Sequence, residues 1–415
     1  MNRRRLAPRS RRLVPTLFAG IALAFHLAAP ATPAWAQRMS DAQSTFIDPS
    51  VDAAGMGRAG VSVFWGDHPN GWANPALLGY HDGVRFVYGR TQLVPDLSDH
   101  VFFTTKEIMI GGGGLGVRMS GKPIKALGSL RLDYGRSVAT DIDGNVIAVF
   151  DSYEEIHDLA IGINLLEAVE TIQRLRGGEP SRLSRKVDLS IGHAWKRVTV
   201  DLFPASIFLG VAAGGEANER DRGALLRLTP LDQFPEGGLA GVSGGGLRWK
   251  IDAAYGFSQR NYAKDDASVD WVGTIAEERL RGGSARVTLR LPGETSGGIW
   301  DFLEPTIAFG ATMESAKYYT KYFQDEDESG GIPSSRSGQE ITLFDAISLR
   351  HGYFRSDDGI IDDDTFGVGA RLRYKKMIGV SYDYAKVPQS VFLENVKRHG
   401  VTAFVDPLLL WKVLR

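Results

Sequence analysis

Between residues 84 and 405, apolar and polar side chains alternate with a period of two. Residues 246–258 give the clearest case. The apolar row contains Leu247, Trp249, Ile251, Ala253, Tyr255 and Phe257, and the polar row contains Arg248, Lys250, Asp252 and Ser258. Residues 285–291, 366–375 and 378–384 repeat the pattern. Because successive side chains of a strand point to opposite faces, this period predicts roughly twelve to sixteen strands.

The segments between these strands carry turn residues, and helical patterning is scarce. Asp141-Ile142-Asp143-Gly144-Asn145 separates predicted strands at residues 127–137 and 146–150, and Asp-Gly is a favoured centre for a hairpin turn. Leu165–Leu175 has the spacing of an amphipathic helix. We expect this helix to lie in a connection between strands.

Alternation by itself fits either a soluble sandwich or a membrane barrel, since both place apolar residues on one face. Three features favour the barrel. The predicted strands run to about ten residues, the length that a tilted membrane strand needs. Their polar rows contain Arg, Lys, Asp and Gly, and tyrosine and tryptophan lie near strand ends, where membrane barrels carry aromatic girdles. The number of strands also exceeds that of one sandwich.

The first 36 residues have the pattern of a secretory signal. Six arginines lie between Arg3 and Arg12, an apolar run follows to Ala29, and Ala34-Trp35-Ala36 fits a cleavage site. Removal of this segment takes away six of the 48 basic residues and none of the 49 acidic ones. The remaining chain therefore carries a net negative charge, which argues against nucleic-acid binding. The absence of cysteine excludes a lipoprotein anchor and a thiol nucleophile. We therefore expect Sec export.

Residues 53–79 contain the spelling Gly55-x-Gly57-x-x-Gly60, which dinucleotide-binding loops share. Such a loop follows a strand and opens a helix. Here no strand-length apolar run precedes Gly55, and Gly66 and Pro69 interrupt the residues after it. The glycines therefore need an explanation other than a bound nucleotide.

The remaining motifs predict no enzyme active site. Residues 241–245 spell a nucleophile elbow, but they form a glycine-rich loop that leads into a predicted strand. Residues 141–145 begin like a calcium loop, yet Val146 stands where glycine is required. The acidic runs 325–328 and 362–364 are expected to be solvated loop charges, and whether they bind divalent ions stays open. We expect neither a cofactor nor a metal ion.

Two segments resemble a known family. The run G-M-G-R-A-G-V-S-V-F-W-G-D-H-P-N-G-W-A-N-P-A-L-L, from Gly55, is similar to the N-terminal signature of FadL-type outer-membrane transporters and of their PorV/PorQ relatives. Residues 367–388 and 396–405 resemble the closing strands of the PorV/PorQ branch. The closing strand itself stays open, because either residues 400–405 or residues 408–414 could fill that place.

This resemblance implies an all-β fold, a monomeric transmembrane antiparallel β-barrel of about 14 strands in the outer membrane. Residues 1–36 would be the signal peptide, 37–83 a hatch segment inside the barrel, and 84–415 the barrel. FadL-type members pass hydrophobic compounds through the barrel, whereas PorV-type members bind exported proteins for a type IX-like secretion system. The expected partners are therefore outer-membrane lipids and either a hydrophobic small molecule or an exported polypeptide.

A hatch gives the glycines a physical role, because chain packed within a barrel runs close to inward-facing side chains and glycine permits that approach. The amide of Asn74 can bind backbone groups that would otherwise be buried without a partner. Trp65 and Trp72 fit either a lipid-binding pocket or aromatic packing. The candidate hatch or ligand-binding residues are Gly55, Gly57, Gly60, Trp65, Trp72, Asn74, Pro75, Ala76 and Leu77.

Overall fold

The computed structural model describes residues 42–66, 70–95, 98–121, 129–203, 213–234, 247–262, 275–292, 298–319, 332–356, 361–389 and 394–407. The predicted signal segment, the elbow motif at residues 241–245, the acidic run 325–328 and residues 408–414 lie outside this part of the chain.

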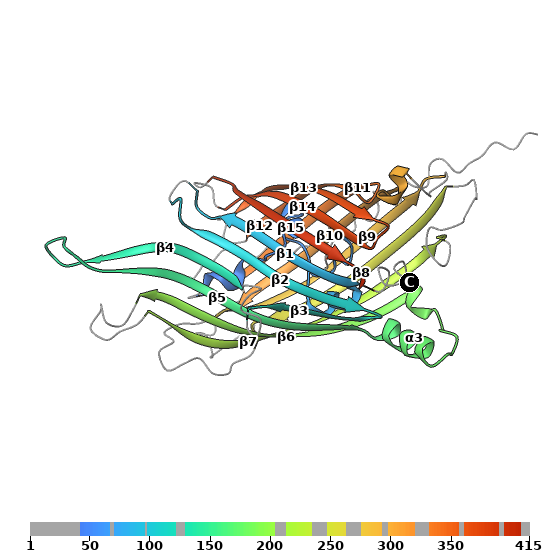
Figure 1. Ribbon diagram of the computed structural model, residues 1–415, viewed down its shortest axis with the longest axis horizontal. Coiled ribbons are helices and arrows are strands. Elements are labelled where there is room, and N and C mark those ends of the chain that lie inside the picture. Colours follow the sequence, from blue (N-terminus) through green and yellow to red (C-terminus); the bar gives the residue numbers. More distant parts are fainter. Residues whose placement is uncertain are drawn as a thin grey trace, which may run out of the picture. The chain divides into compact units, whose positions relative to one another are not determined.

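The described residues form fifteen strands in one sheet, and Figure 1 shows them running side by side. The strands are β1 Gly83–Gln92, β2 Phe102–Gly112, β3 Leu115–Ser120, β4 Leu130–Thr140, β5 Val146–Asn164, β6 Val187–Phe203, β7 Ala213–Asp232, β8 Arg248–Arg260, β9 Glu277–Arg290, β10 Thr306–Tyr319, β11 Ile332–Leu343, β12 Ile347–Ser356, β13 Asp362–Tyr374, β14 Ile378–Val387 and β15 Val396–Val405.

The sheet closes on itself. β1 pairs with β2 on one side and with β15 on the other, and the neighbouring strands run antiparallel. β3 and β4 both lie between β2 and β5 and follow one another at a single position of the ring. The fifteen strands therefore make a closed ring of 14 positions, as predicted. β15 contains residues 400–405, so this part of the chain closes the barrel on β1.

The ladder on β5 passes from one strand to the other between β3 and β4. Ser120, the last residue of β3, pairs with Asp158, and Leu130, the first residue of β4, pairs with Ile156. One residue of β5, His157, separates the two pairs. β3 and β4 therefore continue one line of hydrogen bonding along β5.

The barrel is apolar outside and polar inside. On β8, Tyr255 and Phe257 are 56% and 41% exposed, whereas Asp252 and Ser258 are 3% and 0% exposed. The same division holds on β14, where Val380 and Tyr382 are exposed and Asp383 is buried. An outward apolar surface is what a lipid bilayer requires of a closed barrel, because lipid offers the backbone no hydrogen-bonding partner. The predicted facing of residues 246–258 is thus confirmed.

The helices are short and lie outside the ladder. They are η2 Gln43–Phe46, α2 Val51–Gly55, η3 Pro75–Tyr80, α3 Leu165–Leu175, η5 Leu183–Arg185 and η6 Gly298–Asp301. α3 has the predicted bounds and connects β5 to β6, and the Asn164 side chain caps its first turn by accepting from the Glu167 N–H at 3.2 Å. Among the described residues, no helix is both long and apolar enough to cross a membrane.

The two ends of the ring differ in their connections. The β4–β5 turn lies at one end, the hairpin end, and α3 lies at the opposite end, the α3 end (Figure 1). The Asp141 N–H donates to the Asn145 carbonyl at 2.9 Å, which confirms the predicted hairpin. One expectation was wrong: Asp362, Asp363 and Asp364 begin strand β13 with exposed side chains instead of lying in a loop, because the β12 ladder extends to them.

Candidate functional site

Residues 42–66 and 70–82, which precede β1, are enclosed by the ring; we call them the inner segment. Most of its side chains are buried, and those of Asn74, Ala76 and Leu77 are 0% exposed. Its first half, residues 42–66, carries η2 and α2, and its second half, residues 70–82, carries η3. The nine candidate residues of the sequence all lie in this segment.

Inward-facing glycines of the wall let the inner segment approach the strands. Several are directly paired across neighbouring strands, as Gly162 is with Gly192 and Gly192 with Gly223. A Cβ added to any of eleven such glycines would come within 3.1 Å of an atom of the inner segment. This glycine belt consists of Gly111, Gly116, Gly162, Gly192, Gly223, Gly256, Gly310, Gly338, Gly352, Gly367 and Gly400.

The resemblance predicted close approach at glycines of the inner segment, but most of the glycines that permit this approach stand in the wall. A Cβ on Gly192 would overlap the backbone of Pro75, and one on Gly223 would overlap the Asn74 side chain. The available signal was the position of these glycines in the polar rows of the alternating strands, which face inward. Their alignment across strands depends on register, which alternation along one strand does not reveal.

The three glycines of the Gly55-x-Gly57-x-x-Gly60 motif have separate roles. Gly55 faces the wall, where an added Cβ would lie 2.8 Å from the Gly367 Cα. Gly57 has a φ of 68°, a conformation that costs other residues energy, and its N–H donates to Thr365 Oγ1 at 2.8 Å. The Gly60 N–H donates to a wall carboxylate, Glu314, at 2.8 Å. These contacts involve backbone packing and no cradle for a phosphate.

Asn74 joins the two halves of the inner segment to the wall. Its Nδ2 donates to the Val61 carbonyl at 2.8 Å and to the Ala224 carbonyl of β7 at 3.1 Å. Its Oδ1 accepts from the Ala76 N–H at 3.0 Å and so caps η3, in which Pro75 occupies the first turn. The amide therefore satisfies three backbone groups, those of Val61 and Ala76 fully buried. Leu77 packs behind it against Leu225 of β7.

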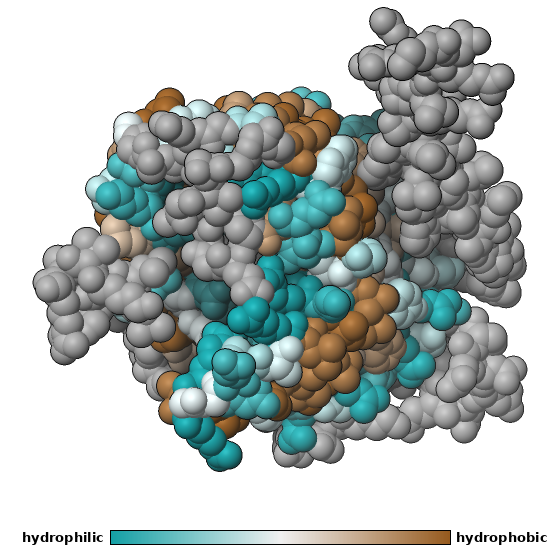
Figure 2. Space-filling model, turned by 90° about the vertical axis from the view of Figure 1, so that its right-hand side faces the viewer, coloured by the Kyte–Doolittle hydropathy of each residue, from teal (hydrophilic) through white to brown (hydrophobic). Residues whose placement is uncertain are grey.

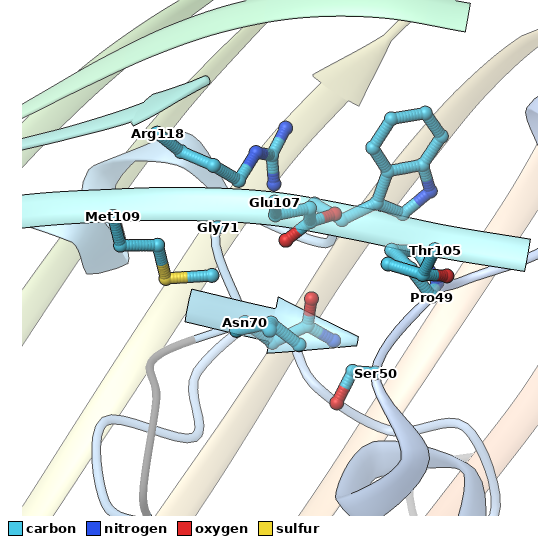
Figure 3. A pocket seen from close by; sticks show the side chains of 10 residues that line it. Pro49, Ser50, Asn70, Gly71, Thr105, Glu107, Met109 and Arg118 are labelled. Carbon is cyan, nitrogen blue, oxygen red and sulfur yellow. The ribbon is translucent and has the colours of Figure 1, made fainter. Parts of the chain in front are cut away.

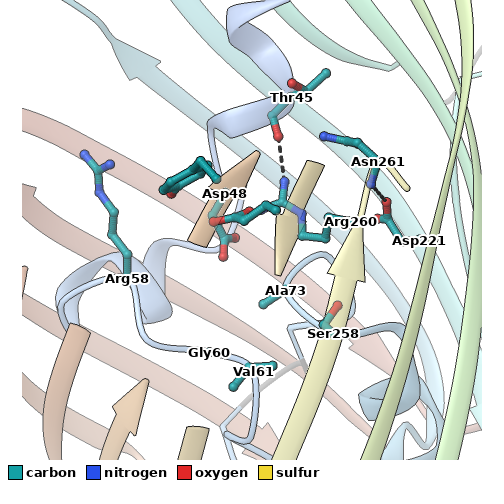
Figure 4. Close-up of polar contacts among 12 residues, drawn as sticks. Thr45, Asp48, Arg58, Gly60, Val61, Ala73, Asp221, Ser258, Arg260 and Asn261 are labelled. Atoms are coloured by element: carbon teal, nitrogen blue, oxygen red, sulfur yellow. Dashed lines mark hydrogen bonds and ion pairs between the residues drawn. The ribbon is translucent and has the colours of Figure 1, made fainter. Parts of the chain in front are cut away.

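Charged side chains of the wall bind the backbone of the first half. Glu314 accepts from the N–H groups of both Gly60 and Val61 at 2.8 Å, and it pairs with Arg336 at 3.0 Å. Arg260 donates through Nη2 to the Thr45 carbonyl at 2.6 Å (Figure 4). Such charge-assisted bonds are roughly twice as strong as neutral ones. Sequence reasoning missed these partners, although their charges stand in inward-facing rows.

Trp72 lies among cations. Lys196 Nζ is 3.9 Å from the ring centre, and the guanidinium carbons of Arg260 and Arg118 are 5.2 and 5.4 Å from it. Lys196 is itself paired with Asp221 at 2.5 Å. The indole is 1% exposed, so the aromatic face binds cations of the wall in this structure.

Trp65, the second candidate tryptophan, is 8% exposed and packs at the belt. An added Cβ on Gly310 of β10 would lie 2.6 Å from the indole ring, so the wall touches the ring only because glycine stands there. The guanidinium carbon of Arg286 lies 5.6 Å from the ring centre. Both tryptophans therefore pack between the inner segment and the wall, and their role toward a ligand stays a prediction.

A small cavity lies beside Trp72. It has a volume of about 10 Å³, and its lining includes Ser50, Asn70, Glu107 and Arg118 (Figure 3). That volume is about the room that one water molecule needs, and the lining offers polar partners to it. With the inner segment in place, this cavity therefore cannot admit a hydrophobic compound.

An apolar cluster faces the interior toward the hairpin end. Phe103 and Leu132 are 1% and 2% exposed, and Trp72 of the inner segment belongs to the same cluster. The cluster consists of Ala42, Trp72, Phe103, Leu130, Leu132, Ile156, Val198, Val200, Ala217 and Ile275, with Ile47, Leu93, Val101, Tyr134 and Leu202 packed against it. It interrupts the polar rows of β2 and β4 to β7.

No protein-family model and no curated protein matches the chain. Among solved structures, the toluene transporter TodX of Pseudomonas putida is similar over 90% of this chain and 98% of that chain, at 10% identity and a TM-score of 0.36. The toluene transporter TbuX of Ralstonia pickettii is similar over 87% and 97%, at 10% identity and a TM-score of 0.37. A FadL homologue of Pseudomonas aeruginosa is similar over 86% and 98%, at 11% identity and a TM-score of 0.37. These neighbours are barrels of the FadL type that the sequence resembles. Because these TM-scores are low, the closed barrel is assigned from the strand pairing described above.

Proposed function

We propose that this chain is an outer-membrane barrel that passes hydrophobic compounds across the outer membrane, and that its inner segment is a hatch. The closed ring satisfies its own backbone and presents an apolar exterior, which fits residence in a bilayer as a monomer. The inner segment fills the ring at the level of the glycine belt, which fits a closed state.

The apolar cluster at the hairpin end carries the proposal. A barrel that conducts only polar solutes has a polar interior. The inward positions of Phe103, Leu132 and Val198 are apolar instead, which favours a hydrophobic solute. In this structure Ala42 and Trp72 of the inner segment cover part of that surface. When the segment moves, the cluster would offer an apolar binding surface, and burial of a ligand there would gain about 25 cal/mol per Å².

The alternative, an accessory barrel that binds exported proteins, has no support from the comparisons. No observation of the described residues favours it, since the apolar cluster faces the interior and could not receive a folded polypeptide past the inner segment. The transport of toluene named for TodX and TbuX agrees with the proposed class of compound, although the proposal does not depend on it.

Uptake into proteoliposomes tests this function. The probes are N-phenylnaphthylamine, a hydrophobic fluorophore, and a polar dye of similar size. Val198→Asn with Leu132→Asn makes the cluster polar, and Thr342→Ser changes the inner wall elsewhere. We expect the double variant to lose uptake of the hydrophobic probe, and the control to retain it, with both proteins still migrating faster unboiled than boiled on a detergent gel.

Deletion of residues 50–79 tests the hatch separately. The strand ladder does not include these residues, so a closed and heat-modifiable barrel should remain. It should admit the polar dye, which the full chain should exclude. An unfolded chain, or a folded one with unchanged permeability, would reject the hatch. Equal uptake of the hydrophobic probe by the cluster variant and its control would reject the transport function.

A further inference from the structure

Helix α3, at the α3 end of the ring, leaves one apolar face uncovered. Leu165, Val169 and Ile172 are 36%, 51% and 49% exposed. Their spacing of four and three residues places them on one side of the helix. The helix is only eleven residues long, so its position depends on packing against other parts of the molecule.

The other two faces of α3 are already occupied. Thr171 and the backbone of Ala168 pack over the β2–β3 turn, where an added Cβ on Gly113 would lie 2.9 Å from Thr171. Glu170 is 2% exposed, and it accepts from the hydroxyls of Ser181 and Ser184 at 2.8 and 2.7 Å. These contacts fix the rotation of the helix, so the exposure of the apolar face is built into the packing.

The apolar face continues the lipid-facing row of the wall. Leu159 of β5 is outward-facing and 41% exposed, and Leu165 keeps the same parity at the point where the strand becomes the helix. On the returning strand β6, Leu189 and Ile191 are 42% and 46% exposed. Figure 2 looks onto this end, and an apolar band lies in the lower part of the view, where Figure 1 places α3.

A cationic side chain borders this face. Arg176 follows Ile172 by four residues, on the same side of the helix, and it is exposed. Arginine and lysine at the edge of an apolar helix face can extend their stems along it and place their charges among lipid phosphates.

We propose that α3 is an interfacial helix that inserts Leu165, Val169 and Ile172 into the phospholipid surface beside β5 and β6. The apolar face covers the boundary between headgroups and acyl chains, and Arg176 binds the phosphate groups. The helix thereby anchors the α3 end of the barrel at the membrane surface. This inference rests on the membrane location of the barrel and is independent of what the barrel transports.

Single-cysteine labelling tests the helix directly, because the chain has no cysteine. The full chain is folded into vesicles of phosphatidylethanolamine and phosphatidylglycerol and labelled with an environment-sensitive fluorophore. Val169→Cys and Ile172→Cys probe the apolar face, Glu179→Cys probes the exposed polar loop after the helix, and Ile191→Cys on β6 is the lipid-facing control. Heat-modifiable migration verifies the fold of each variant.

We expect the labels at positions 169 and 172 to emit at shorter wavelength than the label at 179, and to be quenched by lipids brominated near the carbonyl end of the acyl chain. The label at 191 should be quenched by brominated lipids as well. If 191 is quenched while 169 and 172 behave like 179, the helix lies in water and the proposal is overturned. If the label at 191 also escapes quenching, the barrel wall does not face lipid, and both the membrane location and the proposal for α3 are overturned. Labels that are aqueous in vesicles but shielded in cell envelopes would assign the face to a protein partner and overturn the lipid proposal.

Discussion

The two halves of the inner segment differ in the interactions that hold them to the wall. The first half is bound through its backbone by polar and charged side chains that come largely from β8 to β15, such as Glu314, Arg260 and Thr365. The second half lies against glycines of β2 to β7, as the first half does against glycines of β8 to β15, but it has few side-chain hydrogen bonds to the wall. The apolar cluster faces the same side as the second half.

This difference indicates which half resists which perturbation. Charge-assisted hydrogen bonds depend on the partner's charge and on its exact position, so the first half should respond to removal of a carboxylate. Close packing depends on volume, so the second half should respond to an added methyl group. The first two of the following substitutions should therefore each loosen one half and leave the other in place.

Removal of the Glu314 carboxylate should have the largest effect. Glu314→Ala leaves Arg336 without one buried partner and two backbone N–H groups without an acceptor, a change that costs about 3–5 kcal/mol at buried ion pairs. Hydrogen exchange should accelerate at the Gly60 and Val61 amides and stay unchanged in residues 75–80. Glu216→Ala, at an exposed pair with Arg197, is the matched control and should have little effect. Equal protection of both halves in Glu314→Ala would contradict the division.

An added side chain at Gly192 of the glycine belt should loosen the second half. In Gly192→Val the new Cβ would overlap the backbone of Pro75 and Ala76, and overpacking of this kind costs about 1–3 kcal/mol. Limited proteolysis should then cut within residues 70–82 while the barrel stays heat-modifiable. Ile191→Leu, one residue away on the outward face, serves as control. A cleavage pattern identical to that of the unmodified chain would show that the glycine belt does not determine how closely the second half packs against the wall.

Loss of the Asn74 amide should affect both halves, because its Nδ2 binds Val61 of the first half and Ala224 of the wall. Loss of the cap on η3 in Asn74→Ala costs about 1 kcal/mol, with a further contribution from buried groups left unpaired. Exchange should rise moderately at Val63 and Leu77 together. A change confined to η3 would disprove that Asn74 couples the two halves of the inner segment.

The smallest effect should come from titration of α3. Burial and the charges of Asp82 and Asp188 raise the pKa of Glu167 to about 7 from 4.5, while Arg227 and Arg174 oppose the shift. A pKa raised on folding favours the protonated state, so its contribution is complete at pH values below the unfolded pKa and is lost as the pH rises through about 7. Protection of the α3 amides, measured relative to their base-catalysed intrinsic exchange, should therefore decrease over that window. In Glu167→Gln the decrease should disappear; its persistence would assign the titration to another group.

Local patterns were sufficient to predict the wall. Period two fixed the facing of β8, β9, β13 and β14, because the direction of a strand side chain depends only on its parity. The turn at Asp141–Asn145 and the helix Leu165–Leu175 could also be predicted from local patterns, because turn residues and helical spacing act within a few residues. The number of ring positions came with the resemblance, and pairing of β15 with β1 then selected the closing strand.

The sequence by itself determined that this chain forms strands with an apolar outer row and a polar inner row, and that residues 55–78 differ from them. The tertiary structure decided what the inner row meets. Gly223 reaches Asn74 and Glu314 reaches Gly60 across 149 and 254 positions of the chain, and such contacts depend on how the strands are registered around the ring. Register is a property of neighbouring strands, so a pattern read along one strand does not contain it.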